Sequence, residues 1–214
     1  MIQIFLLGSS SIYGVGAENA GWGDLVKQAL HKKMYSDNGV SEKYEVYNFG
    51  KSGTTVDFVL NTFPQQLKEY GRGGKIITIV AVGANNSKAE NEPDNFVSTI
   101  EEYTKAMSQL LDLLKKSSDH VIAVSAGYYD ESKTNPKHNP LTGMKSYFTN
   151  ARSKMFSERF KELCEERQIT FVTDSVSEAE WKEKYIFTDG LHPNQAGHKL
   201  ISQKVLKQLD KMIL

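Results

Sequence analysis

Short apolar runs alternate with longer segments of helical spacing along this chain, and this alternation constrains the fold more than any other feature. Five runs have the length and composition of buried strands, at residues 2–7, 44–48, 75–81, 121–125 and 170–173. Between and after these runs, apolar residues recur with helical spacing at 22–34, 56–70, 96–116, 147–167 and 195–213. Because strand–helix–strand crossovers are right-handed, the pattern predicts an α/β fold: a three-layer α/β/α sandwich with a five-stranded parallel sheet.

Length and charge narrow the class of protein further. A chain of 214 residues suits one domain, which we expect to span residues 1–214. The 26 Lys and Arg balance the 26 Asp and Glu, so no basic surface points to nucleic acid or to an anionic membrane. The single cysteine, Cys164, excludes an internal disulfide. The first apolar run is too short to span a membrane and lacks signal-peptide features, so we expect a cytoplasmic protein, monomeric or weakly oligomeric.

Four segments rich in small and amide residues lie where a predicted strand ends or a predicted helix begins: 7–16, 48–55, 82–86 and 188–194. In a parallel sheet, ligands bind beyond the carboxyl ends of the strands. Each segment alone also fits an ordinary turn. The first also fits a phosphate-binding turn, although it has neither the Rossmann glycine spacing nor the Walker lysine. Together, the four segments predict a functional site at this edge of the sheet.

Three serines and an Asp–His pair in these segments favour nucleophilic catalysis. Ser9, Ser10 and Ser11 follow the first predicted strand, where a nucleophile would be exposed. Asp189 precedes His192 by three positions with a glycine between them. The carboxylate can therefore accept a hydrogen bond from one ring nitrogen while the other points outward. This is the arrangement that a serine needs, because its hydroxyl attacks well only when a neighbouring base takes the proton.

Taken as a set, the segments resemble the four sequence blocks of the SGNH hydrolases, also called the GDSL esterase/lipase family. The resemblance follows the family's block order and spans nearly the whole chain. It implies the flavodoxin-like SGNH hydrolase fold. The matching residues are Gly8-Ser9-Ser10-Ser11, Gly53, Gly83-Ala84-Asn85-Asn86 and Asp189-Gly190-Leu191-His192.

The resemblance also implies a role for each catalytic group. Ser10 would be the nucleophile, His192 the base and Asp189 the residue that orients the base. The oxyanion hole would consist of the backbone N–H groups of Ser10 and Gly53 and the side-chain amide of Asn85. No metal ion and no cofactor is implied.

The chain departs from the family pattern at two positions. Ser9 stands where the family has the aspartate of Gly-Asp-Ser, and Asn86 stands where it has a second acid after the asparagine. Neither position belongs to the catalytic triad. Since those acids brace loops in relatives, we expect the two substitutions to affect loop rigidity and rate more than mechanism.

We therefore predict a serine ester hydrolase that works through an acyl-enzyme on a small soluble ester, with O-acetyl groups on sugars as one substrate class. An acyl transferase or thioesterase on the same site is an alternative, because one scaffold hosts several reactions. A small-ligand binding protein that has lost turnover is a second alternative, and a phosphate-binding protein that uses the turn at 8–16 is a third.

Other chemically capable residues receive structural interpretations. We expect four histidines to be surface residues, because no spacing assembles a metal site: His31, His120, His138 and His198. Cys164 lies on an amphipathic helix and is expected to pack. The charged stretch 178–184 is expected to be a solvated face, with Trp181 packing beneath the loop before Asp189 or lining the pocket. Segments that follow the strand ends should shape the substrate site: 11–22, 54–58, 86–95 and 126–144, the last without periodic structure.

Overall fold

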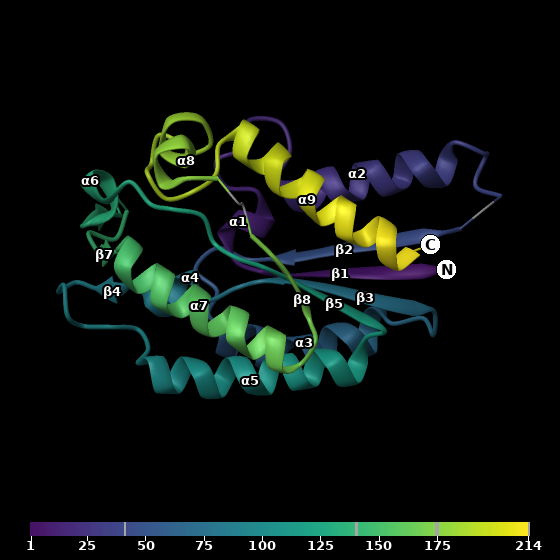
Figure 1. Ribbon diagram of the computed structural model, residues 1–214, viewed down its shortest axis with the longest axis horizontal. Helices are drawn as coiled ribbons and strands as arrows, with labels where there is room; N and C mark the ends of the chain where they lie inside the picture. Colours follow the sequence, from purple (N-terminus) through teal and green to yellow (C-terminus); the bar gives the residue numbers. More distant parts are fainter. Residues whose placement is uncertain (41, 140, 174–175, 214) are drawn as a thin grey trace.

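The computed structural model describes residues 1–40, 42–139, 141–173 and 176–213, and its centre is a five-stranded parallel sheet (Figure 1). In spatial order the strands are β2 (Tyr44–Gly50), β1 (Ile2–Gly8), β3 (Lys75–Ala81), β5 (His120–Val124) and β8 (Thr170–Val172). The chain thus starts in the second strand of the sheet, adds β2 on one side of it and then β3, β5 and β8 on the other, which is the flavodoxin-like order. The predicted fold class is confirmed.

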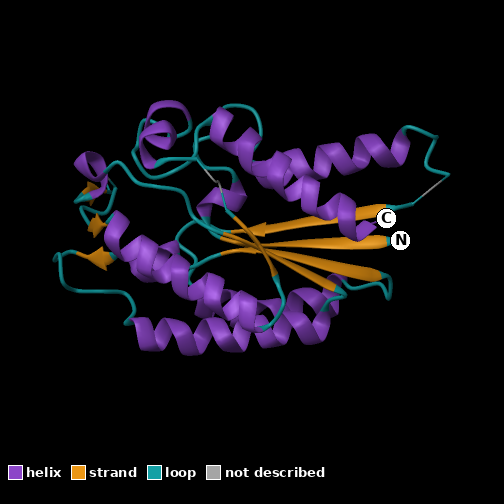
Figure 2. Ribbon diagram, viewed as in Figure 1, coloured by secondary structure: helices purple, strands orange, loops and turns teal. Residues whose placement is uncertain are grey.

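Helices cover both faces of the sheet (Figure 2), which explains why the strands are continuous apolar runs. Every residue of β1 is buried. Phe5 and Leu7 point to one face, and Ile4 and Leu6 to the other. The alternation of side chains along the strand therefore supplies both cores at once.

Three helices pack on the face that is lower in Figure 1: α3 (Val56–Tyr70), α5 (Ile100–Ser117) and α7 (Asn150–Glu166). The predicted apolar stripe of α5 contacts the sheet through fully buried side chains, among them Met107, Leu110 and Leu114. Cys164 of α7 is also fully buried, and burial raises the pKa of its thiol to about 12. Its predicted packing role is confirmed.

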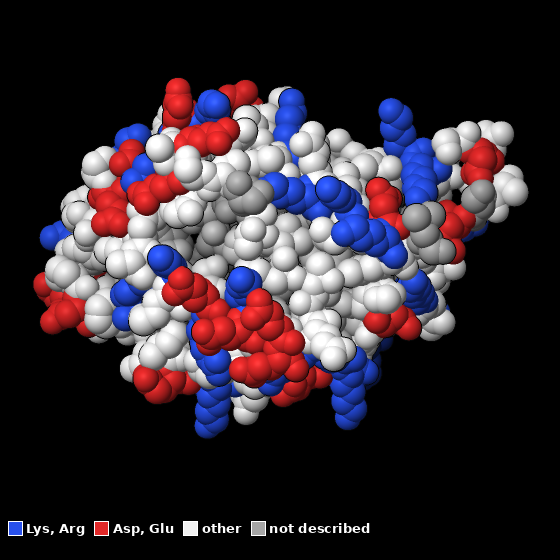
Figure 3. Space-filling model, viewed as in Figure 1, with Lys and Arg blue, Asp and Glu red and all other residues white. Residues whose placement is uncertain are grey.

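The opposite face is covered mainly by α2 (Trp22–Tyr35) and α9 (Gln195–Ile213), with α8 (Glu178–Lys184) at one end. The charged stretch 178–184 is thus a helix that the sequence interpretation missed. Its exposed acids and lysines surround one buried side chain, Trp181. Figure 3 shows basic side chains along α9 and acidic ones gathered over α7, so this face carries both signs of charge.

Two predicted helices begin later than their periodicity indicates, and capping explains both boundaries. The side chain of Thr99 accepts a hydrogen bond from the Glu102 N–H, and the Glu102 carboxylate accepts one from the Thr99 N–H. Thr149 accepts from the N–H of Arg152 in the same way. The caps place the starts of α5 and α7 at Ile100 and Asn150 instead of 96 and 147.

The segment 126–144 was expected to lack periodic structure, and that expectation was wrong. It contains the short helix α6 (Glu131–Thr134) and the strand β6 (Lys137–His138). Pro140 in this segment lies outside the described residues. A three-stranded antiparallel sheet joins β6 to β7 (Lys145–Tyr147) and β4 (Ala89–Glu90). Strands of two or three residues are too short for a pattern of alternation to be visible in the sequence.

No helix in the described ranges has the length and apolar character that crossing a membrane requires.

Candidate active site

The carboxyl ends of β2, β1 and β3 lie in register, and each strand leads directly into one of the predicted segments. Gly8 of β1 is opposite both Gly50 of β2 and Ala81 of β3. Ser10 begins the short helix α1 (Ser10–Tyr13) after β1, and Asn85 lies in α4 (Ala84–Ser87) after β3. The site therefore forms where the strand order reverses, as expected for this sheet type.

Ser10, His192 and Asp189 form a continuous chain of hydrogen bonds. Ser10 Oγ lies 2.8 Å from His192 Nε2, and His192 Nδ1 lies 2.6 Å from Asp189 Oδ2. With a carboxylate at Nδ1, the ring carries its proton there, and Nε2 is free to accept from the serine hydroxyl. The structure brings together the three residues that the sequence singled out, although Ser10 and His192 are 182 positions apart.

Close backbone packing places Ser10 at the carboxyl edge of the sheet. A Cβ on Gly8 would lie 2.2 Å from the Ala81 carbonyl oxygen, so only glycine lets β1 end against β3. The Ser9 N–H donates to that same carbonyl. Ser10 is then the first residue of α1, a position whose N–H has no partner in the preceding turn.

The Asp189 carboxylate is held by its own loop. Oδ1 accepts hydrogen bonds from the N–H groups of Leu191 and His192, at 2.9 and 3.1 Å. Burial alone would raise the pKa of Asp189, but these bonds and the one from the His192 ring hold it well below its usual value. The side chain is therefore a carboxylate over the whole neutral range.

The predicted oxyanion donors differ in how firmly they are held. Gly53 has a left-handed backbone with φ of 80°, and its N–H makes no hydrogen bond to another described residue. Asn85 is 7% exposed, and its side-chain nitrogen donates to the Thr54 carbonyl at 3.0 Å. One of the two amide hydrogens is used in this bond, so the other is available to a ligand.

Asn86, which replaces an acid of the family pattern, is fully buried and makes two long-range bonds. Its side-chain oxygen accepts from the Val56 N–H at the start of α3, and its nitrogen donates to Ser98 Oγ, both at 3.0 Å. The amide thus braces the α4 turn from two directions. Ser9, the other departure, is buried, but its side chain makes no capping bond to α1.

Comparison with known proteins shows where the chain belongs. Residues 6–200 match the model of the GDSL-like lipase/acylhydrolase family. The chain belongs to this family. Membership confirms the resemblance drawn from the sequence blocks and the prediction of a carboxylic ester hydrolase.

Two plant members of the GDSL family are similar along most of the chain. The GDSL esterase/lipase CPRD49 of Arabidopsis thaliana is 26% identical over 96% of this chain and 77% of its own length. The GDSL esterase/lipase WDL1 of Oryza sativa subsp. japonica is 25% identical over the same shares.

Solved structures share the fold at lower identity. A lipolytic G-D-S-L family protein from Veillonella parvula superposes with a TM-score of 0.69 at 16% identity and covers 97% of both chains. The acetylxylan esterase Axe2 from Geobacillus stearothermophilus gives 0.67 at 18% identity and covers 96% of this chain and 92% of its own.

Beside Ser10 and His192, this GDSL-family chain has a cavity of about 50 Å³. Asn85 reaches its wall, and four large side chains narrow it: Tyr129, Phe148, Trp181 and Ile201. Trp181 fits because residue 127 is glycine, where a Cβ would lie 2.3 Å from the indole. Trp181 therefore lines the cavity, one of its two predicted positions.

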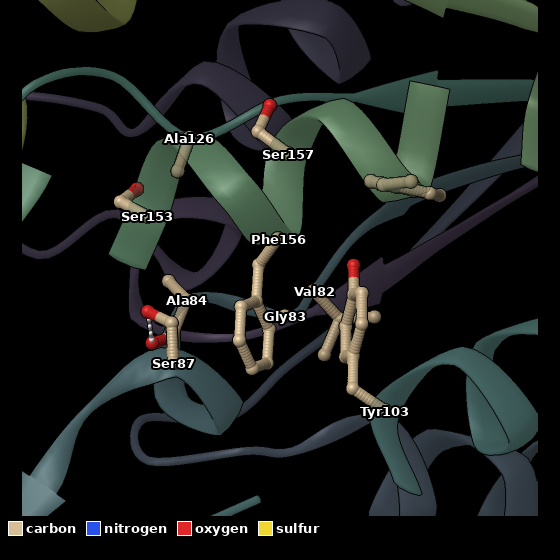
Figure 4. A pocket seen from close by; sticks show the side chains of 10 residues that line it. Val82, Gly83, Ala84, Ser87, Tyr103, Ala126, Ser153, Phe156 and Ser157 are labelled. Atoms are coloured by element: carbon tan, nitrogen blue, oxygen red, sulfur yellow. Dashed lines mark hydrogen bonds between the residues drawn. The ribbon is translucent and has the colours of Figure 1, made fainter. Parts of the chain in front are cut away.

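A second, smaller cavity of about 20 Å³ lies behind the α4 turn (Figure 4). Tyr103 and Phe156 project into it from α5 and α7, and Ser87 donates to the Ala84 carbonyl. A Cβ on Gly83 would lie 2.9 Å from the Tyr103 hydroxyl oxygen, so this turn rests closely on α5. Neither Ser10 nor His192 lines this space, whereas Gly83, Ala84 and Ser87 of the turn that carries Asn85 do.

The prediction that His198 is a surface residue was wrong. His198 is fully buried at the start of α9, where Nδ1 accepts from the Trp22 N–H at 3.1 Å and Nε2 donates to the Val15 carbonyl at 3.0 Å. Burial lowers the pKa of its ring below the ordinary value, so the ring is neutral. The other three histidines are half-buried or exposed.

Sequence reasoning also missed a cation beside Asp189. The Lys137 ammonium lies 3.1 Å from Asp189 Oδ2 and 3.2 Å from the Asp189 carbonyl oxygen. No sequence signal marks Lys137, because it comes from β6, 52 positions away. In the parts of the chain that are described, no group of three or more His, Cys, Asp or Glu side chains is arranged to hold a metal ion.

Proposed function

We propose that this chain is a serine ester hydrolase that cleaves small acyl esters, O-acetyl groups on sugars among them, through an acyl-enzyme intermediate. The observation that carries the proposal is the hydrogen bond of 2.8 Å between Ser10 Oγ and His192 Nε2, with Asp189 on the other ring nitrogen. This is the arrangement that turns a serine hydroxyl into a nucleophile.

In the first half of the reaction, Ser10 Oγ attacks the ester carbonyl carbon while His192 Nε2 takes the hydroxyl proton. The carbonyl oxygen becomes an oxyanion that accepts from the N–H groups of Ser10 and Gly53 and from the Asn85 amide. When the intermediate collapses, the bond to the alcohol oxygen breaks, and His192 gives its proton to the leaving alcohol.

In the second half, water attacks the acyl-enzyme. His192 takes a proton from the water, the same three donors hold the second oxyanion, and the Ser10 oxygen leaves with the proton returned. Asp189 stays ionised throughout and stabilises the imidazolium that forms in both halves. Its lowered pKa supports this role.

The size of the cavity supports a short acyl group. About 50 Å³ is far below the several hundred Å³ of pockets that enclose larger ligands. Trp181 and Phe148 are among the large side chains that line the cavity, and we expect them to exclude a long acyl chain. The acetylxylan esterase among the similar structures acts on acetyl esters, in keeping with this size.

Labelling with an organophosphonate serine probe, read by intact mass, tests the mechanism. We expect the wild type and Ser11→Ala to gain one adduct and Ser10→Ala to gain none. Ser11 is the matched control because its hydroxyl accepts from the Trp22 indole N–H at 3.1 Å and does not contact His192. Labelling of Ser10→Ala at the wild-type rate would contradict the nucleophile assignment.

Hydrolysis of p-nitrophenyl acetate, butyrate and octanoate tests the acyl group. We expect kcat/KM to fall from acetate to octanoate, and Trp181→Ala to reduce that preference by enlarging the cavity. Equal kcat/KM for acetate and octanoate would contradict the short-acyl proposal. A wild type that neither labels nor turns over, but is stabilised by phosphate or nucleotides in a thermal shift, would favour the phosphate-binding alternative.

A further inference from the structure

The segment that runs from α6 to β6 contacts the loop that carries Asp189. The Asp130 N–H donates to the Gly190 carbonyl at 2.9 Å, and a Cβ on Gly190 would lie 2.8 Å from Lys133 Cβ. Lys137, at the far end of the segment, reaches both the side chain and the backbone of Asp189. The loop is therefore fixed from outside as well as by its own bonds.

Lys137 and His192 share one oxygen of Asp189. Oδ2 accepts from His192 Nδ1 at 2.6 Å and from the Lys137 ammonium at 3.1 Å, while Oδ1 is occupied by the two backbone N–H groups. Within the described residues Lys137 pairs with no other carboxylate. The Lys137 and Asp189 side chains are 30% and 20% exposed, so solvent only partly screens the pair.

The other charged or titratable groups near this loop do not contact the Asp189 carboxylate. Lys133 of α6 pairs with Asp130 Oδ2 at 3.1 Å. On the side of α9, the buried ring of His198 is neutral and hydrogen-bonded to backbone groups, and Asp24 of α2 acts on that ring. Among the described residues, Lys137 is thus the lysine or arginine that contacts the Asp189 carboxylate.

We propose that Lys137 is a positioning residue of the active site, which holds Asp189 Oδ2 in line with His192 Nδ1 and balances the carboxylate charge. This inference rests on the proposed function. Without the ammonium, the Asp189 charge would act on His192 alone and would hold the proton on the ring more strongly. The base would then be available only at higher pH.

The experiment compares pH profiles of p-nitrophenyl acetate hydrolysis for the wild type, Lys137→Gln, Lys137→Arg and Lys133→Gln. For Lys137→Gln we expect kcat/KM near neutral pH to fall about fivefold. This factor is the rate change that corresponds to losing the interaction energy of one partly exposed ion pair. The acid limb should move to higher pH, because the charge of Asp189 is no longer balanced. Lys137→Arg should restore both, because it keeps the charge.

Lys133→Gln is the matched control, since it removes the same charge from the same segment but pairs with Asp130. It should keep the wild-type acid limb. The proposal is overturned if Lys137→Gln keeps the wild-type profile, or if Lys133→Gln moves the acid limb equally, because a general field effect would then suffice.

A measurement without turnover separates this inference from the proposed function. The low-field ¹H NMR resonance of the proton between His192 and Asp189 should shift or broaden in Lys137→Gln and not in Lys133→Gln. If the wild type shows neither turnover nor labelling, the proposed function fails, and this resonance alone decides the role of Lys137. If Lys137→Gln does not fold, Lys137→Met, which keeps the apolar stem, takes its place in both measurements.

Discussion

Gly190 follows Asp189 and Gly53 is a proposed oxyanion donor, and the two glycines have nearly the same backbone, with φ of 73° and 80°. Their surroundings differ. A Cβ on Gly190 would lie within 3.2 Å of atoms of Lys133 and Asp130, whereas a Cβ on Gly53 would meet nothing within 4 Å. Under the proposed function, the packed glycine belongs to the loop that orients the base, and the open glycine leaves its N–H accessible to the oxyanion.

The largest expected effect tests the packed side. Asp189→Asn keeps the shape of the side chain but lets the amide donate to His192 Nδ1, which places the ring proton on Nε2. The serine then has no acceptor, and we expect kcat to fall about 10⁴-fold. Steady-state hydrolysis of p-nitrophenyl acetate measures it, and circular dichroism checks the fold. A fall of less than tenfold would show that loop packing alone orients the ring.

The next effect tests the open side. Asn85→Ala removes the proposed side-chain donor to the oxyanion, and we expect kcat to fall about 10²- to 10³-fold with KM little changed. The variant also loses the bond to the Thr54 carbonyl. Thr54→Ser, which leaves that backbone carbonyl in place, is the control for disturbance of this loop. An increase in KM without a change in kcat would assign Asn85 to substrate binding.

Stability measurements compare the two glycines directly. Both alanine variants strain a left-handed backbone, at a cost of about 1 kcal/mol. Gly190→Ala adds overpacking against Lys133 and Asp130, which costs roughly a further 1 to 3 kcal/mol. We expect urea denaturation to show the larger loss of unfolding free energy for Gly190→Ala. Equal losses would mean that the α6 segment moves aside easily.

The smallest effect concerns His198, which connects the start of α9 to the backbone of Trp22 and Val15 through hydrogen bonds. Its pKa is lowered in the folded protein, so the unfolded chain binds more protons just below the ordinary histidine value. Stability is therefore fully present above that value and falls as the pH drops through the window between the two pKa values. Thermal melting from pH 7 to pH 5 should show a steeper decline for the wild type than for His198→Gln.

The sequence singled out the residues of the proposed site where their position, relative to a strand or to each other, marks them. Ser10, Gly53 and Asn85 each follow a strand whose apolar run is visible, and Asp189 and His192 are three positions apart. The order of blocks then predicted which segments meet. The fold class followed from the same runs, because parallel strands that are buried on both faces are continuous apolar segments and can be recognised without an alternation of apolar and polar residues.

Residues whose roles depend on distant backbone could not be predicted. His198 is buried because the Trp22 N–H and the Val15 carbonyl, more than 170 positions away, satisfy its ring. Lys137 meets Asp189 because a strand of only two residues carries it there. The helix α8 was missed because acids and lysines outnumber its single buried tryptophan. In each case, the contact that determines the position of the residue or helix produces no periodic pattern in the sequence.

The bond between Ser10 and His192 joins residues that are 182 positions apart, near the two ends of the described chain. During synthesis the serine is therefore made long before the histidine, and under the proposed function a growing chain holds an unactivated hydroxyl until the C-terminal part of the chain packs on the sheet. Phosphonate labelling would then report on folding as well as on chemistry. The time course of adduct formation after dilution from urea would follow the docking of the last helix, with no added fluorophore.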